Sequence, residues 1–176
     1  MEKKLLLVVD YQVDFVSGSL GFPQAEKLAG RIAEKIRAYR ANGDEIAFTL
    51  DTHGEDYLKT QEGRFLPVGH CVRGTDGWEL YGEVAKLRRP GDAAFVKDRF
   101  GSPRLFEYLS GQAYAGVELV GVVTNICVLA NAVLAKTALP ETPVEVDASC
   151  CASADESLHQ KALDVMEGLQ IRVTNR

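Results

Sequence analysis

Runs of apolar residues alternate along the chain with stretches in which apolar residues recur every three or four positions. The runs are typical of strands buried on both faces, and the recurring spacing is typical of amphipathic helices. We expect strands at residues 4–9, 45–50, 93–97, 117–123, 144–147 and 169–173. We expect helices at residues 25–41, 103–109, 127–139 and 155–168. This alternation predicts an α/β fold, with a mainly parallel sheet covered by helices on both faces.

Residues 51–90 interrupt this alternation of strand and helix patterns, because no apolar periodicity is sustained there and Gly, His, Asp and Pro are frequent. Long irregular segments in compact domains are often functional, and the aromatic residues within this one indicate order. There are no internal repeats and no linker-like stretches. Residues 1–176 are therefore expected to form a single domain.

Composition and charge narrow the classes of function. The net charge is −5 at pH 7, with 46% hydrophobic and 26% charged residues. An acidic chain argues against binding to nucleic acids or anionic membranes, which needs a basic face. The apolar run at residues 5–9 is too short for a signal peptide or a membrane span. The four cysteines form no Cys-x-x-Cys pair, so we expect reduced thiols in a cytoplasmic protein.

Three residues capable of catalysis lie where predicted strands end. Asp10 follows the first strand, Lys97 closes the third, and Cys127 starts the helix after the fourth. Taken singly, Asp10 would be interpreted as a turn former, Lys97 as a solvated charge and Cys127 as a small core residue. Ligands bind outside the carboxyl ends of strands in open parallel sheets, so the shared position favours one catalytic site.

Cys127 has the strongest claim to be a nucleophile. The segment 121–127 predicts a sharp turn from strand to helix, which exposes a side chain. The dipole and free amides at a helix N-terminus would lower the pKa of the thiol and could hold an oxyanion. Cys71, Cys150 and Cys151 lack this setting, so we interpret them as structural. A redox role would need a resolving cysteine near Cys127, and none is adjacent.

A second group lies in the irregular segment. Asp51 and His53 point to one side of an extended chain, and His70 follows with Glu62 between them. These side chains suit an open site for a divalent metal such as zinc, manganese or iron. Histidines hydrogen-bonded to loop backbone explain the same residues equally well. His159 lies on a late predicted helix and is interpreted as a surface or packing residue.

Five segments together resemble the isochorismatase-like cysteine hydrolase superfamily, and within it the nicotinamidase (pyrazinamidase) branch. Each is a weak motif alone, but all five occur in the order and spacing of that family. They are LVVDYQVDF at 7–15, DTH at 51–53, HCVRGTDG at 70–77, VKDRF at 96–100 and GVVTNICV at 121–128. The resemblance covers nearly the whole chain. It implies a Rossmann-like three-layer α/β/α fold around a six-stranded, mainly parallel sheet.

The resemblance also assigns roles to residues. Asp10 would take the proton from Cys127, and Lys97 would orient both and balance their charge. The backbone N–H groups of Val123 and Cys127 would form the oxyanion hole, with a cis peptide joining Val122 and Val123.

The resemblance further implies a bound divalent metal and no organic cofactor. Asp51, His53 and His70 would hold the metal, with Glu62 as an optional fourth ligand. Tyr57 stands near the place where some members have another histidine. Phe15 would stack on the substrate ring, with Phe65 or Leu66 opposite.

The leading hypothesis is an amidohydrolase that converts nicotinamide to nicotinate and ammonia through a thioester, a step of NAD salvage. Another small carboxamide or an N-carbamoyl compound is the alternative substrate. A non-catalytic member that binds a metal or ligand is less well supported, because Asp10, Lys97 and Cys127 are all present. A homo-oligomer is expected by analogy alone.

Overall fold

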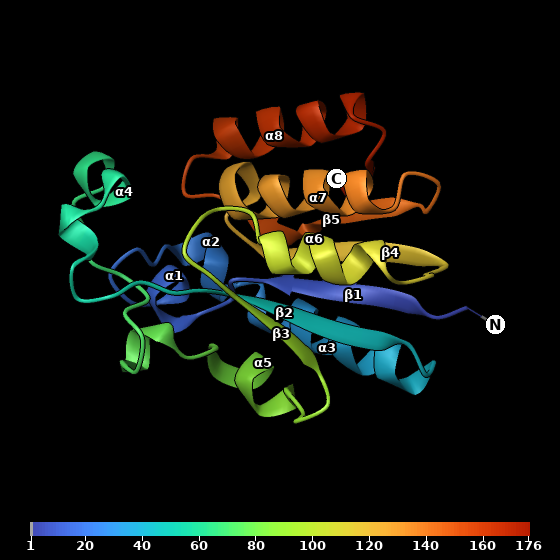
Figure 1. Cartoon of the computed structure of the whole chain (residues 1–176), viewed down its shortest axis with the longest axis horizontal. Helices are drawn as coiled ribbons and strands as arrows, with labels where there is room; N and C mark the ends of the chain where they lie inside the picture. Colours follow the sequence, from blue (N-terminus) through green and yellow to red (C-terminus); the bar gives the residue numbers. More distant parts are fainter. Residues whose placement is uncertain (1) are drawn as a thin grey trace.

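A single six-stranded sheet forms the centre of the computed structural model, which describes residues 2–176 (Figure 1). The strands lie in the order β3-β2-β1-β4-β5-β6, and every described pair is parallel. Their bounds are β1 (Lys4–Val9), β2 (Glu45–Asp51), β3 (Ala93–Lys97), β4 (Gly116–Val122), β5 (Val144–Ala152) and β6 (Arg172–Thr174). The predicted sheet is therefore confirmed. Strand order reverses between β1 and β4, which creates a switch point where a ligand site is expected.

Helices cover both faces of the sheet (Figure 1). One layer consists of α6 (Pro103–Ser110), α7 (Leu129–Ala138) and α8 (Glu156–Gly168). The other consists of α1 (Val13–Val16), α2 (Pro23–Glu26), α3 (Ala29–Ala41) and α5 (Gly82–Leu87). Successive residues of β1 contribute alternately to the two hydrophobic clusters, which explains why its sequence is apolar throughout.

Several predicted boundaries were wrong. The helix expected at 25–41 is divided into α2 and α3, and β5 continues to Ala152 because its second half pairs with β4 around Gly121. The last strand starts only at Arg172, since residues 169–171 still bond to the end of α8. Tertiary pairing with β4 thus sets the end of β5, whereas local hydrogen bonds at the end of α8 delay the start of β6.

The segment 51–90 is ordered and contains short helices. They are η1 (Tyr57–Lys59), α4 (Gln61–Phe65), η2 (Asp76–Trp78) and α5. Thr60 caps α4 by accepting a hydrogen bond from the Gly63 N–H at 3.0 Å. In Figure 1, α4 projects beyond the carboxyl ends of the strands. These helices are too short to show a helical period in the sequence.

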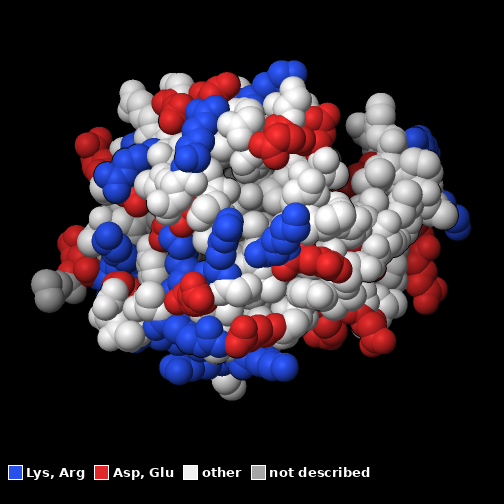
Figure 2. Space-filling view, turned by 180° about the vertical axis from the view of Figure 1, so that it is seen from behind, with Lys and Arg blue, Asp and Glu red and all other residues white. Residues whose placement is uncertain are grey.

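Basic and acidic side chains are interspersed on the surface of the molecule over the face shown in Figure 2. Within residues 2–176, all four cysteines are free and buried. Among the same residues, no helix combines the length and apolar character needed to cross a membrane.

Candidate active site

Three side chains predicted to be catalytic converge at the carboxyl ends of the strands. Lys97 Nζ lies 2.6 Å from Asp10 Oδ2 and 3.6 Å from Cys127 Sγ. All three residues are buried, with Cys127 the most exposed at 5%. The structure thus brings the three residues together: Lys97 ends β3, whereas Asp10 follows β1 and Cys127 follows β4.

Asp10 has an unusual backbone conformation and is hydrogen-bonded to Thr49 of β2. Its φ is 45°, in the left-handed region that few non-glycine residues adopt. Thr49 Oγ1 donates a hydrogen bond of 2.6 Å to Asp10 Oδ1. The backbone N–H of Asp10 donates to Thr49 in return. This arrangement leaves Oδ2 directed at Lys97.

Cys127 lies in a π-helical turn, η3 (Thr124–Val128), which precedes α7. The N–H of Val128 donates to the carbonyl oxygen of Val123 at 3.2 Å, the i to i+5 bond that defines such a turn. The prediction that a regular helix starts at Cys127 was therefore wrong. The expected cis peptide between Val122 and Val123 is present. The oxyanion hole of Val123 and Cys127 stays a prediction, and both residues line the cavity described below.

The electrostatics of the site correct one expectation. Burial, followed by the charge of Asp10, raises the pKa of the Cys127 thiol well above its usual range, and Lys97 only partly opposes this. The expected lowering by a helix N-terminus is therefore wrong. Burial also raises the pKa of Asp10, against the effect of Lys97. Burial would lower the pKa of Lys97, but the charges around it raise that pKa overall.

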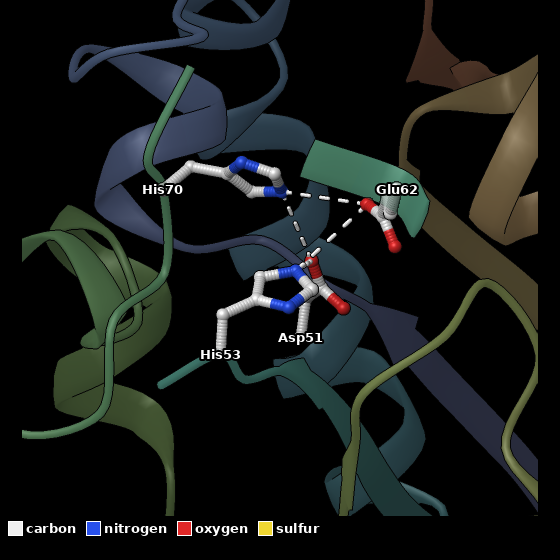
Figure 3. Close-up of side chains that lie close together, drawn as sticks. All are labelled: Asp51, His53, Glu62 and His70. Carbon is white, nitrogen blue, oxygen red and sulfur yellow. Dashed lines mark hydrogen bonds and ion pairs between the residues drawn. The ribbon is translucent and has the colours of Figure 1, made fainter. Parts of the chain in front are cut away.

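Asp51, His53, Glu62 and His70 form a second cluster beside the first (Figure 3). One ligand atom from each residue lies within 4.8 Å of the others. Asp51 Oδ2 is 3.0 Å from His53 Nε2 and 3.4 Å from His70 Nε2. Glu62 Oε1 is 3.9 Å from both Nε2 atoms. The structure thus brings all four predicted ligands together, and α4 carries Glu62 to the cluster.

The donor set fits a divalent metal. Two imidazoles and two carboxylates suit zinc, manganese or iron. His70 Nδ1 lies 2.9 Å from the carbonyl oxygen of Val68, a bond that orients the other ring nitrogen toward the cluster. Burial would raise the pKa of Asp51, but hydrogen bonds from His53 and His70 and the Lys97 charge keep it far below the usual range. An ionised carboxylate is thus available as a ligand.

Two residues of the first motif that were assigned no role hold this cluster in place. Gln12 Nε2 donates to the Asp51 carbonyl oxygen at 2.9 Å, and the Asp51 N–H donates to Gln12 Oε1 at 2.7 Å. Asp14 Oδ2 accepts a hydrogen bond from the N–H of Cys71, next to His70. The sequence did contain a signal for these two residues, because they are polar positions between apolar ones directly after a strand. Tyr57 packs on both imidazoles.

A cavity of about 270 Å³ is bordered by Cys127 of the first cluster and by Asp51, Glu62 and His70 of the second. Its wall is mainly apolar, and Phe15 and Leu66 line it, whereas their contact with a substrate stays a prediction. The structure places Phe65 outside this cavity, 84% exposed and beside a neighbouring groove. The lining residues that the sequence did not reveal are Leu20, Phe22, Phe100, Asn125, Ile126, Ala154, Asp155 and Leu158. They come from loops, from η3 and from the start of α8, which only the tertiary structure brings together.

Asn131 is another residue that the sequence did not reveal. It is fully buried in α7. Its Nδ2 donates to the carbonyl oxygens of Cys127, at 2.8 Å, and Phe100, at 3.1 Å. Its Oδ1 accepts from the Ser102 N–H at 3.0 Å. Asn131 therefore ties the turn of Cys127 to the loop that follows Lys97.

Comparisons with known proteins agree with this geometry. The family model of the isochorismatase domain matches residues 4–176. The chain is 27% identical to the nicotinamidase of Saccharomyces cerevisiae over 216 residues, covering 98% of this chain and 100% of the relative. The structure of pyrazinamidase/nicotinamidase from Streptococcus mutans matches with a TM-score of 0.86 and 30% identity, covering 97% of this chain and 99% of the other. The pyrazinamidase of Pyrococcus horikoshii in complex with zinc matches with a TM-score of 0.84 and 27% identity, covering 99% of each chain.

Proposed function

The chain belongs to the isochorismatase family, and on this premise we propose that it is a nicotinamidase that uses Cys127 as its nucleophile. The enzyme hydrolyses amides, and the reaction proposed is the conversion of nicotinamide and water to nicotinate and ammonia. The observation that carries the mechanism is the meeting of Asp10, Lys97 and Cys127 beside one cavity. The nicotinamidase relatives support the choice of substrate.

The first half of the reaction forms a thioester. The raised pKa of Cys127 keeps the resting thiol protonated, so Asp10 accepts its proton as Sγ attacks the amide carbon. The amides of Val123 and Cys127 donate hydrogen bonds to the oxyanion. The C–N bond then breaks, and the proton held by Asp10 goes to the leaving ammonia. Because the proton moves within the site, the buried charge of Lys97 stays balanced throughout.

The second half releases the acid. Asp10, again a carboxylate, accepts a proton from water as the water oxygen attacks the thioester carbon. The C–S bond breaks, and Asp10 returns the proton to Cys127 Sγ. One water is consumed, and the chain is restored to its starting state.

The cavity supports a small, flat carboxamide. Phe15 offers a ring face, and the largely apolar wall would desolvate the substrate. Asp51, His53, Glu62 and His70 would hold a divalent metal at the end of the cavity near Asp51. When bound, such a metal supplies a Lewis acid that a ring nitrogen or a water molecule can ligate.

Ammonia release from nicotinamide by the purified protein tests this function. We expect release that is lost in Cys127→Ala and retained in the matched control Cys150→Ala, which removes a buried thiol outside the site. Release should also fall after chelation and return with added zinc or manganese. Release that persists in Cys127→Ala would overturn the mechanism. An inactive wild type that hydrolyses another carboxamide or an N-carbamoyl compound would overturn only the substrate.

A further inference from the structure

His159 is hydrogen-bonded to the first residue of the nucleophile's turn. Its Nδ1 lies 2.8 Å from Thr124 Oγ1, although the two residues are 35 positions apart. Thr124 is fully buried and His159 is 7% exposed. The element that carries His159, α8, packs directly on η3. The Thr124 hydroxyl thus has a buried partner from a distant helix.

The position of Thr124 determines where the reactive groups lie. It is the first residue after Val123, whose carbonyl oxygen accepts hydrogen bonds from both Ile126 N–H (3.1 Å) and Val128 N–H (3.2 Å). Cys127 lies between those two donors. A shift of Thr124 would therefore move the thiol and the amides proposed to hold the oxyanion together. Misplacement of reacting groups by about 1 Å can cost about 100-fold in rate.

Other contacts hold different parts of the turn. Ser153 Oγ donates to Asn125 Oδ1 at 2.7 Å, and Asn131 Nδ2 donates to the Cys127 carbonyl oxygen at 2.8 Å. Ser153 therefore holds the middle of η3, and Asn131 holds its end. The Thr124 side chain at the start of the turn is held by His159. Burial lowers the pKa of His159, which favours the neutral imidazole.

We propose that His159 is a positioning residue for Cys127, acting through the hydroxyl of Thr124. The inference rests on the proposed cysteine mechanism. His159 is absent from the residues that line the cavity, so it acts on the geometry of the turn and not on the substrate. Its loss should lower kcat and leave KM nearly unchanged.

Three substitutions separate this role from simple packing. His159→Asn keeps a polar amide atom at the place of Nδ1, whereas His159→Gln reaches toward the place of Nε2. His159→Leu keeps bulk and removes the hydrogen bond. We expect kcat to fall about 10- to 100-fold in the Leu and Gln variants and to recover largely in the Asn variant. Thr124→Val should reproduce the loss, and the double variant Thr124→Val/His159→Leu should be no slower than either single variant.

Met166→Ala is the matched control, because Met166 is a fully buried residue of the same helix and belongs to the core alone. It should lower Tm while kcat of the folded protein stays at the wild-type value. Wild-type kcat in His159→Leu, or equal losses in the Asn and Leu variants, would overturn the proposal. The rate of Cys127 alkylation by iodoacetamide gives a readout without substrate. It should change in His159→Leu and not in Met166→Ala, even if nicotinamide proves to be the wrong substrate.

Discussion

Lys97 donates a hydrogen bond of 3.1 Å to Asp51 Oδ1, and the two residues are register partners on neighbouring strands. The other oxygen of Asp51 faces the imidazoles of His53 and His70. One carboxylate therefore belongs both to the cluster around the thiol and to the candidate metal cluster. A substitution of Asp51 itself should therefore be felt in both clusters.

Asp51→Asn tests this sharing. The amide lacks the negative charge that a metal and Lys97 both face, so metal content and kcat should fall together, with kcat reduced at least about 100-fold. The measurements are metal per chain after dialysis against zinc, and the rate of ammonia release. His70→Ala is the comparison: it should lower metal content but leave the pH profile of Cys127 alkylation unchanged. Wild-type metal content in Asp51→Asn would contradict the shared role.

The alkylation of Cys127 should depend on pH as expected for a protonated thiol. Because burial and the Asp10 charge raise its pKa, the thiolate fraction is small at neutral pH. The rate with iodoacetamide should keep rising as the pH passes about 8.5, where an unperturbed cysteine is half ionised. Mass spectrometry of the peptide that contains Cys127 provides the rate. A plateau below pH 7 would indicate a stable thiolate and contradict this expectation.

Asn131→Ala should be strongly destabilising. The substitution leaves the carbonyls of Cys127 and Phe100 and the N–H of Ser102 without their partner. Buried groups left unpaired in this way cost about 2–4 kcal/mol of unfolding free energy in total. Urea denaturation measures the loss. Thr137→Ala, which removes an exposed hydrogen bond in the same helix, should stay within about 0.5 kcal/mol of the wild type, and similar losses in both would refute the argument.

Two glycines should respond to alanine in opposite directions. Gly121 has φ of 119°, and an added Cβ would overlap the carbonyl oxygen of Val9 on the neighbouring strand. Gly121→Ala should therefore cost more than about 2 kcal/mol or prevent folding. Gly30 lies in α3 with open space around its added Cβ, so Gly30→Ala should stabilise by up to about 1 kcal/mol. Thermal unfolding of both variants tests these two expectations. A Gly121→Ala protein as stable as the wild type would contradict the close approach of Gly121 to Val9.

Much of the site could be predicted because strand ends are visible in the sequence. β1 and β3 have the bounds expected from their apolar runs, and parallel strands bring their carboxyl ends to one edge. Asp10 and Lys97 were found in this way. The four residues of the candidate metal cluster could also be predicted, since Asp51 and His53 lie at a strand end and the other two follow in the same segment. Phe65 was misplaced because nothing local indicates which face of α4 meets the cavity.

The sequence by itself determined the parallel sheet and the residue types that gather at its edge, because apolar periodicity and strand ends are local properties of the chain. Only the tertiary structure decided the π turn at Cys127, the raised pKa of its thiol and the bond from His159 to Thr124. The raised pKa and the bond to Thr124 depend on segments far apart in sequence, and the π turn is held by contacts from the distant residues Ser153 and His159. Desolvation and hydrogen bonding act over a few ångströms in space, and only folding brings those segments that close.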